Sequence, residues 1–233
     1  MPADAWATLA LTLASDDPHS KEQALTGRKL LLSLERADGS FGSAKRDDPP
    51  EIYATLLAAW ALQSSESIDP DPSTRASRVS AFAWLRQSFQ ASSELRSVAG
   101  LEEQFVWVLL EARRSSPAER DGDDVLRAAA DDIVSRCALD RTTHACTRAV
   151  YEDDAATLGD GKIVTLWFAW VGVAARELAA SDVTLPSDVR RDLVDISAWA
   201  SSTAESSVDG LAALPPYKLA EYLIATSALA TSR

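Results

Sequence analysis

The chain has 233 residues and a formal net charge of −12, because 35 acidic residues outnumber 23 basic ones. So negative a chain disfavours binding to nucleic acids and to acidic membrane surfaces, which both select positively charged faces. Hydrophobic residues make up 46% of the chain, as in a folded globular protein, and the apolar run 163–175 is too short to span a bilayer. Residues 1–15 lack the basic start and long apolar stretch of a secretion signal, so we expect a cytoplasmic protein.

Hydrophobic residues recur at the helical spacing of three and four, as Trp6, Leu9 and Leu13 do near the start of the chain. No stretch keeps the two-residue period of a strand, so we expect almost no strand. Ser20 and Gln23 predict a capping box at the start of the second helix. Proline and glycine divide the chain into nine predicted helices. Their expected ranges are 3–14, 20–36, 50–64, 73–90, 98–114, 122–138, 161–180, 187–204 and 215–231.

The predicted helices alternate in character along the chain. The first, third and later odd ones carry apolar blocks such as YATLLAAWAL, and the even ones carry charge along one face. A helix that is apolar nearly all round must be covered on most sides, whereas an amphipathic helix needs cover on one side only. We therefore expect one all-α domain over residues 1–233, a two-layer array of helix hairpins with buried inner and solvent-facing outer helices. Aromatic residues that open the inner helices recur at about 50 residues, which favours a helix-pair repeat over a plain bundle.

The two-layer arrangement also predicts which side chains are buried. The inner-helix side chains expected to be almost fully buried are Trp60, Leu109 and Trp170. The charged side chains expected in solvent are those of Lys21, Arg28 and Arg191. Six aromatic residues are candidates to line a cavity or an interface, although aromatics at helical spacing are more often core: Trp60, Trp84, Trp107, Trp167, Phe168 and Trp170.

The most informative motif is GRKLLLSLERADGSFG, residues 27–42, followed by PPEIYATLLAAWALQ, residues 49–63. Gly39 permits the positive φ that ends a helix, and Phe41 can fold back onto the helix end. Together the segments resemble the repeat of the terpenoid cyclase and protein prenyltransferase α/α-toroid families, with an aliphatic triplet, a Gly-x-aromatic turn and a Thr-containing second helix. Glu35 and Phe41 occupy positions where those families usually have Gln and Trp. The resemblance implies a toroid of hairpins, and nine helices imply an open or incomplete one.

The resemblance also implies catalytic acids, which this chain carries in altered form. Class II terpene cyclases protonate their substrate with an Asp-x-Asp-Asp motif, and the nearest string here is Tyr151 followed by Glu152, Asp153 and Asp154. Such chemistry needs one carboxylic acid kept protonated in a dry cavity. In so acidic a chain an acid run more often lies in solvent, so we expect no catalytic residue and keep Glu152, Asp153 and Asp154 as the alternative.

Cys137, His144 and Cys146 lie within ten residues of one another. Thiolates and imidazole suit zinc, and prenyltransferases carry a zinc site, but this spacing is not that of a standard finger. A Cys137–Cys146 disulfide is a further alternative. With only two cysteines in the chain we expect two unpaired thiols, no metal and no other cofactor.

Two classes of function follow. The resemblance covers scaffold residues while the acid motif is degenerate, and a fold does not carry a function by itself. We therefore expect a catalytically silent helical-repeat module that binds a protein partner or an apolar small molecule in its concave centre. The alternative is an isoprenoid-handling enzyme, like a class II terpene cyclase or a prenyltransferase, that uses the degenerate acid run.

Overall fold

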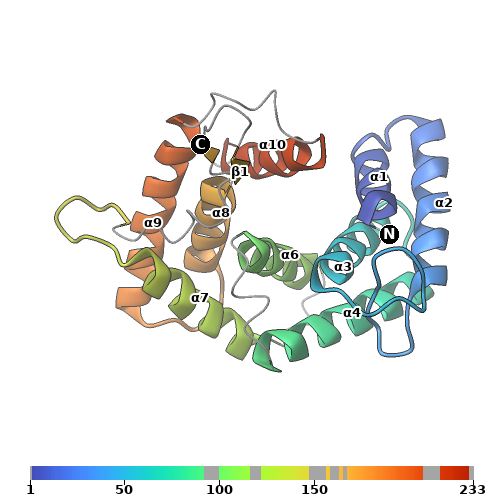
Figure 1. Cartoon of the computed structure of the whole chain (residues 1–233), viewed down its shortest axis with the longest axis horizontal. Helices are drawn as coiled ribbons and strands as arrows, with labels where there is room; N and C mark the ends of the chain where they lie inside the picture. The colour runs from blue at the N-terminus through green and yellow to red at the C-terminus, as the bar shows by residue number, and fades with distance from the viewer. Residues whose placement is uncertain are drawn as a thin grey trace. The chain divides into compact units, whose positions relative to one another are not determined.

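A computed structural model describes residues 2–91, 100–115, 122–146, 156–157, 163–164, 167–206 and 216–230. Within these ranges the chain forms nine α-helices and one antiparallel pair of two-residue strands (Figure 1), which confirms the all-α class. The helices are α1 (Pro2–Leu13), α2 (Pro18–Leu34), α3 (Ile52–Glu66), α4 (Pro72–Ala91), α6 (Leu101–Ser115), α7 (Asp123–Cys137), α8 (Trp167–Ala180), α9 (Ser187–Ser206) and α10 (Pro216–Ala230). The strands are β1 (Ala156–Thr157) and β2 (Ile163–Val164). No helix in the described ranges is long and apolar enough to cross a membrane.

Each helix falls within or close to a predicted range, and two of the starts that differ have an evident physical cause. The capping box at Ser20 is wrong, because α2 begins at Pro18 and the carboxylate of Asp17 accepts the Ser20 N–H at 2.8 Å. Aspartate at the N-cap followed by proline is a strong helix start. The helix predicted from residue 161 begins only at Trp167, because the β-branched residues of β2 pair with β1 instead.

Two compact units divide the chain, residues 1–95 and residues 96–233, and they are called the first and the second unit below. The first unit contains α1 to α4, where α3 packs against α1, α2 and α4. Every side chain from Ala54 to Leu62 of α3 is buried, whereas α2 buries little beyond Ala24 and Leu31. This contrast confirms α3 as an inner helix. The expectation for α1 is wrong, because Leu13 is 76% exposed and α1 buries one face only.

The link between α2 and α3 is held by hydrogen bonds that the backbone of Phe41 makes to Thr55 and Glu51. Phe41 is fully buried, its N–H donates to Thr55 Oγ1 at 3.0 Å, and its carbonyl accepts the Glu51 N–H at 2.9 Å. Gly39 has φ of 83°, as predicted, although α2 has already ended at Leu34 and Gly39 shapes the link rather than the helix end. A Cβ on Gly39 would lie 2.8 Å from the carbonyl carbon of Ser80 in α4. The motif therefore brings α2, α3 and α4 together.

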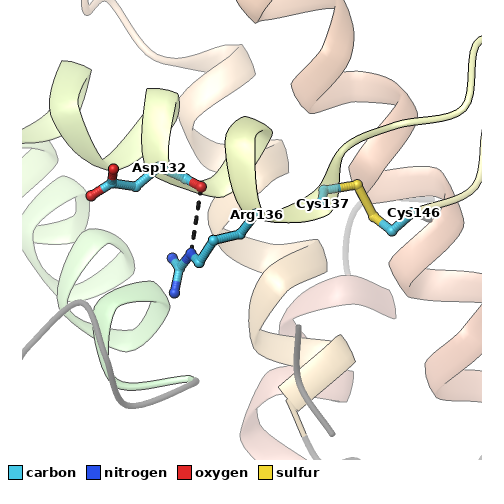
Figure 2. The surroundings of a disulfide bond; sticks show 4 residues. All are labelled: Asp132, Arg136, Cys137 and Cys146. Atoms are coloured by element: carbon cyan, nitrogen blue, oxygen red, sulfur yellow. Dashed lines mark hydrogen bonds between the residues drawn. A yellow bond between two sulfur atoms is a disulfide. The ribbon is translucent and has the colours of Figure 1, made fainter. Parts of the chain in front are cut away.

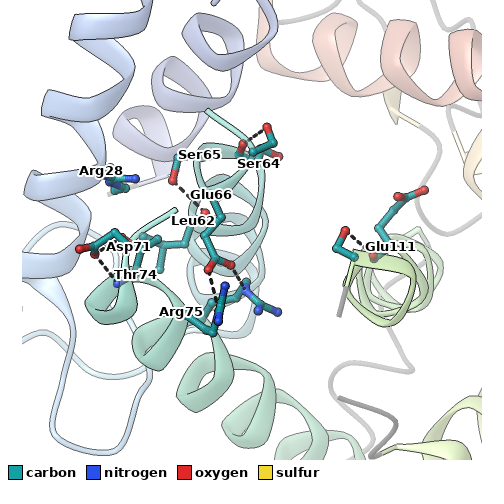
Figure 3. A network of polar contacts seen from close by, with 12 residues as sticks. Arg28, Leu62, Ser64, Ser65, Glu66, Asp71, Thr74, Arg75 and Glu111 are labelled. Carbon is teal, nitrogen blue, oxygen red and sulfur yellow. Dashed lines mark hydrogen bonds and ion pairs between the residues drawn. The ribbon is translucent and has the colours of Figure 1, made fainter. Parts of the chain in front are cut away.

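Ion pairs connect the helices of the first unit, and Figure 3 shows one of them, between Glu66 of α3 and Arg75 of α4 at 3.2 Å. Arg28 is only 6% exposed, and its guanidinium donates to the carboxylate of Asp69 at 2.9 Å and to the Asp69 carbonyl at 2.6 Å. The prediction that Arg28 lies in solvent is therefore wrong. The reason is periodicity, because Arg28 follows Ala24 by four residues and precedes Leu31 by three, so all three share the buried face of α2. Lys21 is exposed, as predicted.

The second unit contains α6 to α10. All side chains from Ala169 to Ala175 of α8 are buried, and α6 is buried along most of its length. Leu109 and Trp170 are 2% and 0% exposed, and the Arg191 side chain is in solvent, as predicted. Since α7 and α9 each bury one face, α6 to α9 confirm the alternation of inner and outer helices.

The helix α10 departs from the expected inner character. Leu223 is 55% exposed, and among the described side chains of α10 only Ala225 is buried. This helix packs against α8. The arrangement of the hairpins as a toroid and the single domain remain predictions.

Candidate functional site

The six aromatic candidates divide between the two units. Trp60 and Trp84 belong to the first unit, where Trp60 is 8% exposed and Trp84 is half-buried on α4. Trp107 and Trp170 belong to the second unit. Trp167 and Phe168 open α8, but their side chains lie outside the described ones.

Each unit contains two tryptophans in ring contact. Trp6 of α1 meets Trp60 of α3 edge to face, with ring centroids 5.6 Å apart, and the Trp6 indole N–H donates to Tyr53 Oη at 3.2 Å. Trp107 of α6 meets Trp170 of α8 with centroids 5.3 Å apart and a tilt of 52°. In each pair one indole is buried and the other, Trp6 or Trp107, is partly exposed. We call these the two tryptophan pairs.

The sequence predicts the two tryptophan pairs only in part. Trp6 was not among the six candidates, although it opens the first predicted apolar block. Helical spacing places an aromatic residue on the apolar face of its helix, but it does not predict which other ring packs against it. The pairing of Trp6 with Trp60 bridges two helices and depends on their packing.

Cys137 and Cys146 are joined by a disulfide bond, with Cα atoms 4.7 Å apart (Figure 2). The expectation of two unpaired thiols is therefore wrong. Cys137 is the last residue of α7, and Ala138 takes the left-handed conformation that turns the chain. The chain then returns, and Leu139 pairs with Cys146 in an isolated β-bridge. This return brings the two sulfur atoms together.

The disulfide also bears on the alternative of a zinc site at Cys137, His144 and Cys146. Thiolates are the zinc ligands, and here both sulfur atoms are bonded to each other. His144 directs its Nδ1 to the carboxylate of Asp195 in α9 at 3.0 Å. Within the described ranges, no group of three or more His, Cys, Asp or Glu residues is arranged to hold a metal ion.

The segment between the two cysteines, residues 138–145, is called the disulfide loop. Its Arg141 forms a two-pronged ion pair with the carboxylate of Asp192 in α9, one contact at 2.7 Å, which raises the pKa of Arg141. Asp140 accepts the backbone N–H groups of Thr143 and Thr142 at 2.9 and 2.7 Å, and these bonds lower the pKa of Asp140. The loop is thus ordered from within and attached to α9.

Two carboxylates are buried at the start of α6. Glu102 and Glu103 are both fully buried, and the guanidinium of Arg136 from α7 pairs with each of them, at 3.1 Å for Glu103. Glu103 also accepts the Gly100 N–H at 2.9 Å. Negative charge is favoured at a helix N-terminus, where backbone N–H groups point outward. The cluster therefore attaches α6 to α7.

Sequence reasoning missed this cluster. Its signal is the string LEEQFVWVLL, in which two adjacent acids precede a helix that is apolar nearly all round. The acid run Glu152, Asp153 and Asp154 lies outside the described residues. Its exposure therefore stays a prediction.

Comparison with known proteins found no relative. No protein-family model matches the chain, and neither a curated protein nor a solved structure matches it. The resemblance to the toroid families rests on the residues of the 27–63 segment alone.

Proposed function

We propose that the chain is a binding module without chemistry of its own, in which the partly exposed tryptophan of each unit takes up an apolar segment of a partner protein. The observation that supports this proposal is the two tryptophan pairs, in which Trp6 and Trp107 each lie against a second indole. Tryptophan is among the residues that contribute most to binding energy at interfaces. An indole already held by a buried neighbour loses little conformational freedom on binding.

The charge of the chain adds a property of the partner. With a net charge of −12, the module attracts a partner whose apolar segment is flanked by basic residues. The groups best suited to chemistry among the described residues have structural partners: the two sulfur atoms form a disulfide, and Glu102 and Glu103 pair with Arg136. These pairings support a scaffold role for them.

The test compares variants at the tryptophan pairs with matched surface variants. Trp6→Leu and Trp107→Leu reduce the aromatic surface while keeping an apolar side chain, and Val194→Ala and Leu223→Ala alter residues that are each 55% exposed elsewhere. The binding proposal expects a protein that co-purifies with the chain and with both surface variants but is lost from the tryptophan variants at unchanged melting temperature. Titration of that protein should quench tryptophan fluorescence saturably. Equal binding by all variants would contradict the proposal.

The isoprenoid-handling alternative has its own test. The full chain is incubated with linear isoprenoid diphosphates and with squalene, and products are sought by mass spectrometry. We expect no product. Turnover that is abolished in Asp154→Asn at unchanged melting temperature would overturn the binding module.

A further inference from the structure

Backbone strain is concentrated in the disulfide loop. In the part of the chain that the structure describes, only two residues other than glycine have positive φ, Ala138 at 45° and His144 at 53°. Both lie between Cys137 and Cys146. The left-handed conformation is unfavourable for residues with a Cβ, and it persists only where the surrounding structure enforces it. Here the Cys137–Cys146 disulfide closes the loop that contains both Ala138 and His144.

The same loop provides side-chain contacts to α9. Arg141 binds both carboxylate oxygens of Asp192, which is 5% exposed, and His144 contacts Asp195. Further along α9, Ser197 donates to the carbonyl of Gly172 in α8 at 2.9 Å. The disulfide loop therefore contacts a helix that packs against the buried α8.

We propose that the Cys137–Cys146 disulfide is a redox switch, which holds α9 to the end of α7 when oxidised and releases it when reduced. Reduction removes the restraint on Ala138 and His144, the loop relaxes, and Arg141 leaves Asp192. This inference is independent of the proposed binding function. The sequence predicts a cytoplasmic chain, and the rare disulfides of that compartment are usually transient and either catalytic or redox-sensing.

The two sulfur atoms differ in solvent exposure, and this difference determines which of them a reductant attacks first. Cys137 is fully buried, whereas Cys146 is partly exposed. A thiolate of a dithiol reductant attacks Cys146 Sγ, the S–S bond breaks, and Cys137 leaves as a thiolate that takes up a proton. The second thiol of the reductant then displaces Cys146 Sγ. The chain gains two electrons and two protons, and the reductant becomes a cyclic disulfide.

The test is amide hydrogen exchange on the full chain before and after reduction with dithiothreitol, with both thiols counted by alkylation. We expect exchange in residues 138–146 and in the first half of α9 to rise at least tenfold on reduction. Exchange in α7 before residue 134 should stay within twofold, and reoxidation should restore the original pattern.

Two variants distinguish a disulfide that switches the attachment of α9 from one that only stabilises the fold. Ala138→Gly relieves the strain at one position, so reduction should change α9 exchange by less than threefold in this variant. Arg141→Met removes the contact but keeps the disulfide, so α9 should exchange fast already in the oxidised chain. Unchanged α9 exchange in a fully reduced chain would overturn the proposal. The proposal would also be overturned if reduction removed amide protection throughout α6 to α9. It would be overturned as well if dithiothreitol did not reduce the disulfide.

Discussion

The two units connect their helices by different physical means. In the first unit the link from α2 to α3 is held by hydrogen bonds of the Phe41 backbone, and the residue with positive φ in this link is Gly39. In the second unit the residue with positive φ after α7 is Ala138. The loop that follows it is closed by a disulfide and bound to α9 by ion pairs. A glycine makes such a turn stable by itself, whereas an alanine makes it dependent on cross-links. The loop after α7 in the second unit is thus the connection that reduction of a disulfide can open.

The units share one feature, a tryptophan pair with a single buried indole at its centre. In the second unit this is Trp170, which is fully buried, and in the first unit it is Trp60 at 8% exposed. Each unit therefore has a core of its own, and substitutions can be designed to weaken one core at a time. The expected effects are given below from the largest to the smallest.

The largest effect is expected for Trp170→Ala in the second unit. Truncating a fully buried indole removes its packing against Trp107 and leaves a cavity, which costs about 3–5 kcal/mol of unfolding free energy. Urea unfolding, with hydrogen exchange in α6 and α8 as the local readout, measures this loss. Val194→Ala on the exposed face of α9 is the control and should cost less than about 0.5 kcal/mol. A loss of stability equal to that of the control would refute the burial of this side chain.

Gly39→Val tests whether the link of the first unit depends on its glycine. Valine resists a φ of 83°, and its Cβ would collide with the backbone of Ser80, so we expect a loss of about 2–4 kcal/mol. The matched control is Ala37→Val, an exposed position in the same link. Thermal melting curves that shift equally for the two variants would show that the turn does not require glycine.

Arg28→Met tests the buried guanidinium that sequence reasoning placed in solvent. Methionine keeps the length of the side chain but leaves the Asp69 carbonyl without its donor, at a cost of about 1–3 kcal/mol in urea unfolding. Lys29→Met, at the exposed neighbouring position, is the control. Equal stability of the two variants would contradict the burial of the Arg28 guanidinium.

The smallest effect is expected for Asp71 before α4. Hydrogen bonds from the Ser73 and Thr74 hydroxyls and from the Thr74 N–H lower the pKa of Asp71 from 3.8 to about 2. A lowered pKa stabilises the fold above the unfolded pKa, and this contribution is lost as the pH falls through the folded pKa. The stability difference between the wild type and Asp71→Asn should therefore shrink between pH 4 and pH 2.

A second variant checks the cause of that pH dependence. Thr74→Val keeps the Asp71 carboxylate but removes the Thr74 hydroxyl, so its stability should depend on pH less steeply than that of the wild type. Acid unfolding followed by circular dichroism gives both comparisons. A wild-type curve parallel to that of Asp71→Asn over this range would contradict the lowered pKa.

Helix positions and the inner and outer character of α2 to α4 and α6 to α9 were predictable from the sequence, because both depend on the spacing of apolar residues within a few turns. The positive φ of Gly39 was predictable for the same reason, since it follows from the chemistry of one residue in one turn. Apolar content alone misjudged α1, because Leu13 is exposed where no other element covers it. A residue can be apolar without having a neighbour to bury it.

Contacts between distant residues were decided by tertiary structure. Arg28 meets Asp69 across 41 positions, and Arg141 meets Asp192 across 51, so neither pair leaves a mark in local spacing. The disulfide lay among the alternatives from its spacing alone, and the turn at Ala138 together with the bridge from Leu139 to Cys146 selected it. Local periodicity specifies which face of a helix is apolar, whereas the packing of helices determines which polar groups are enclosed with that face and what they bind.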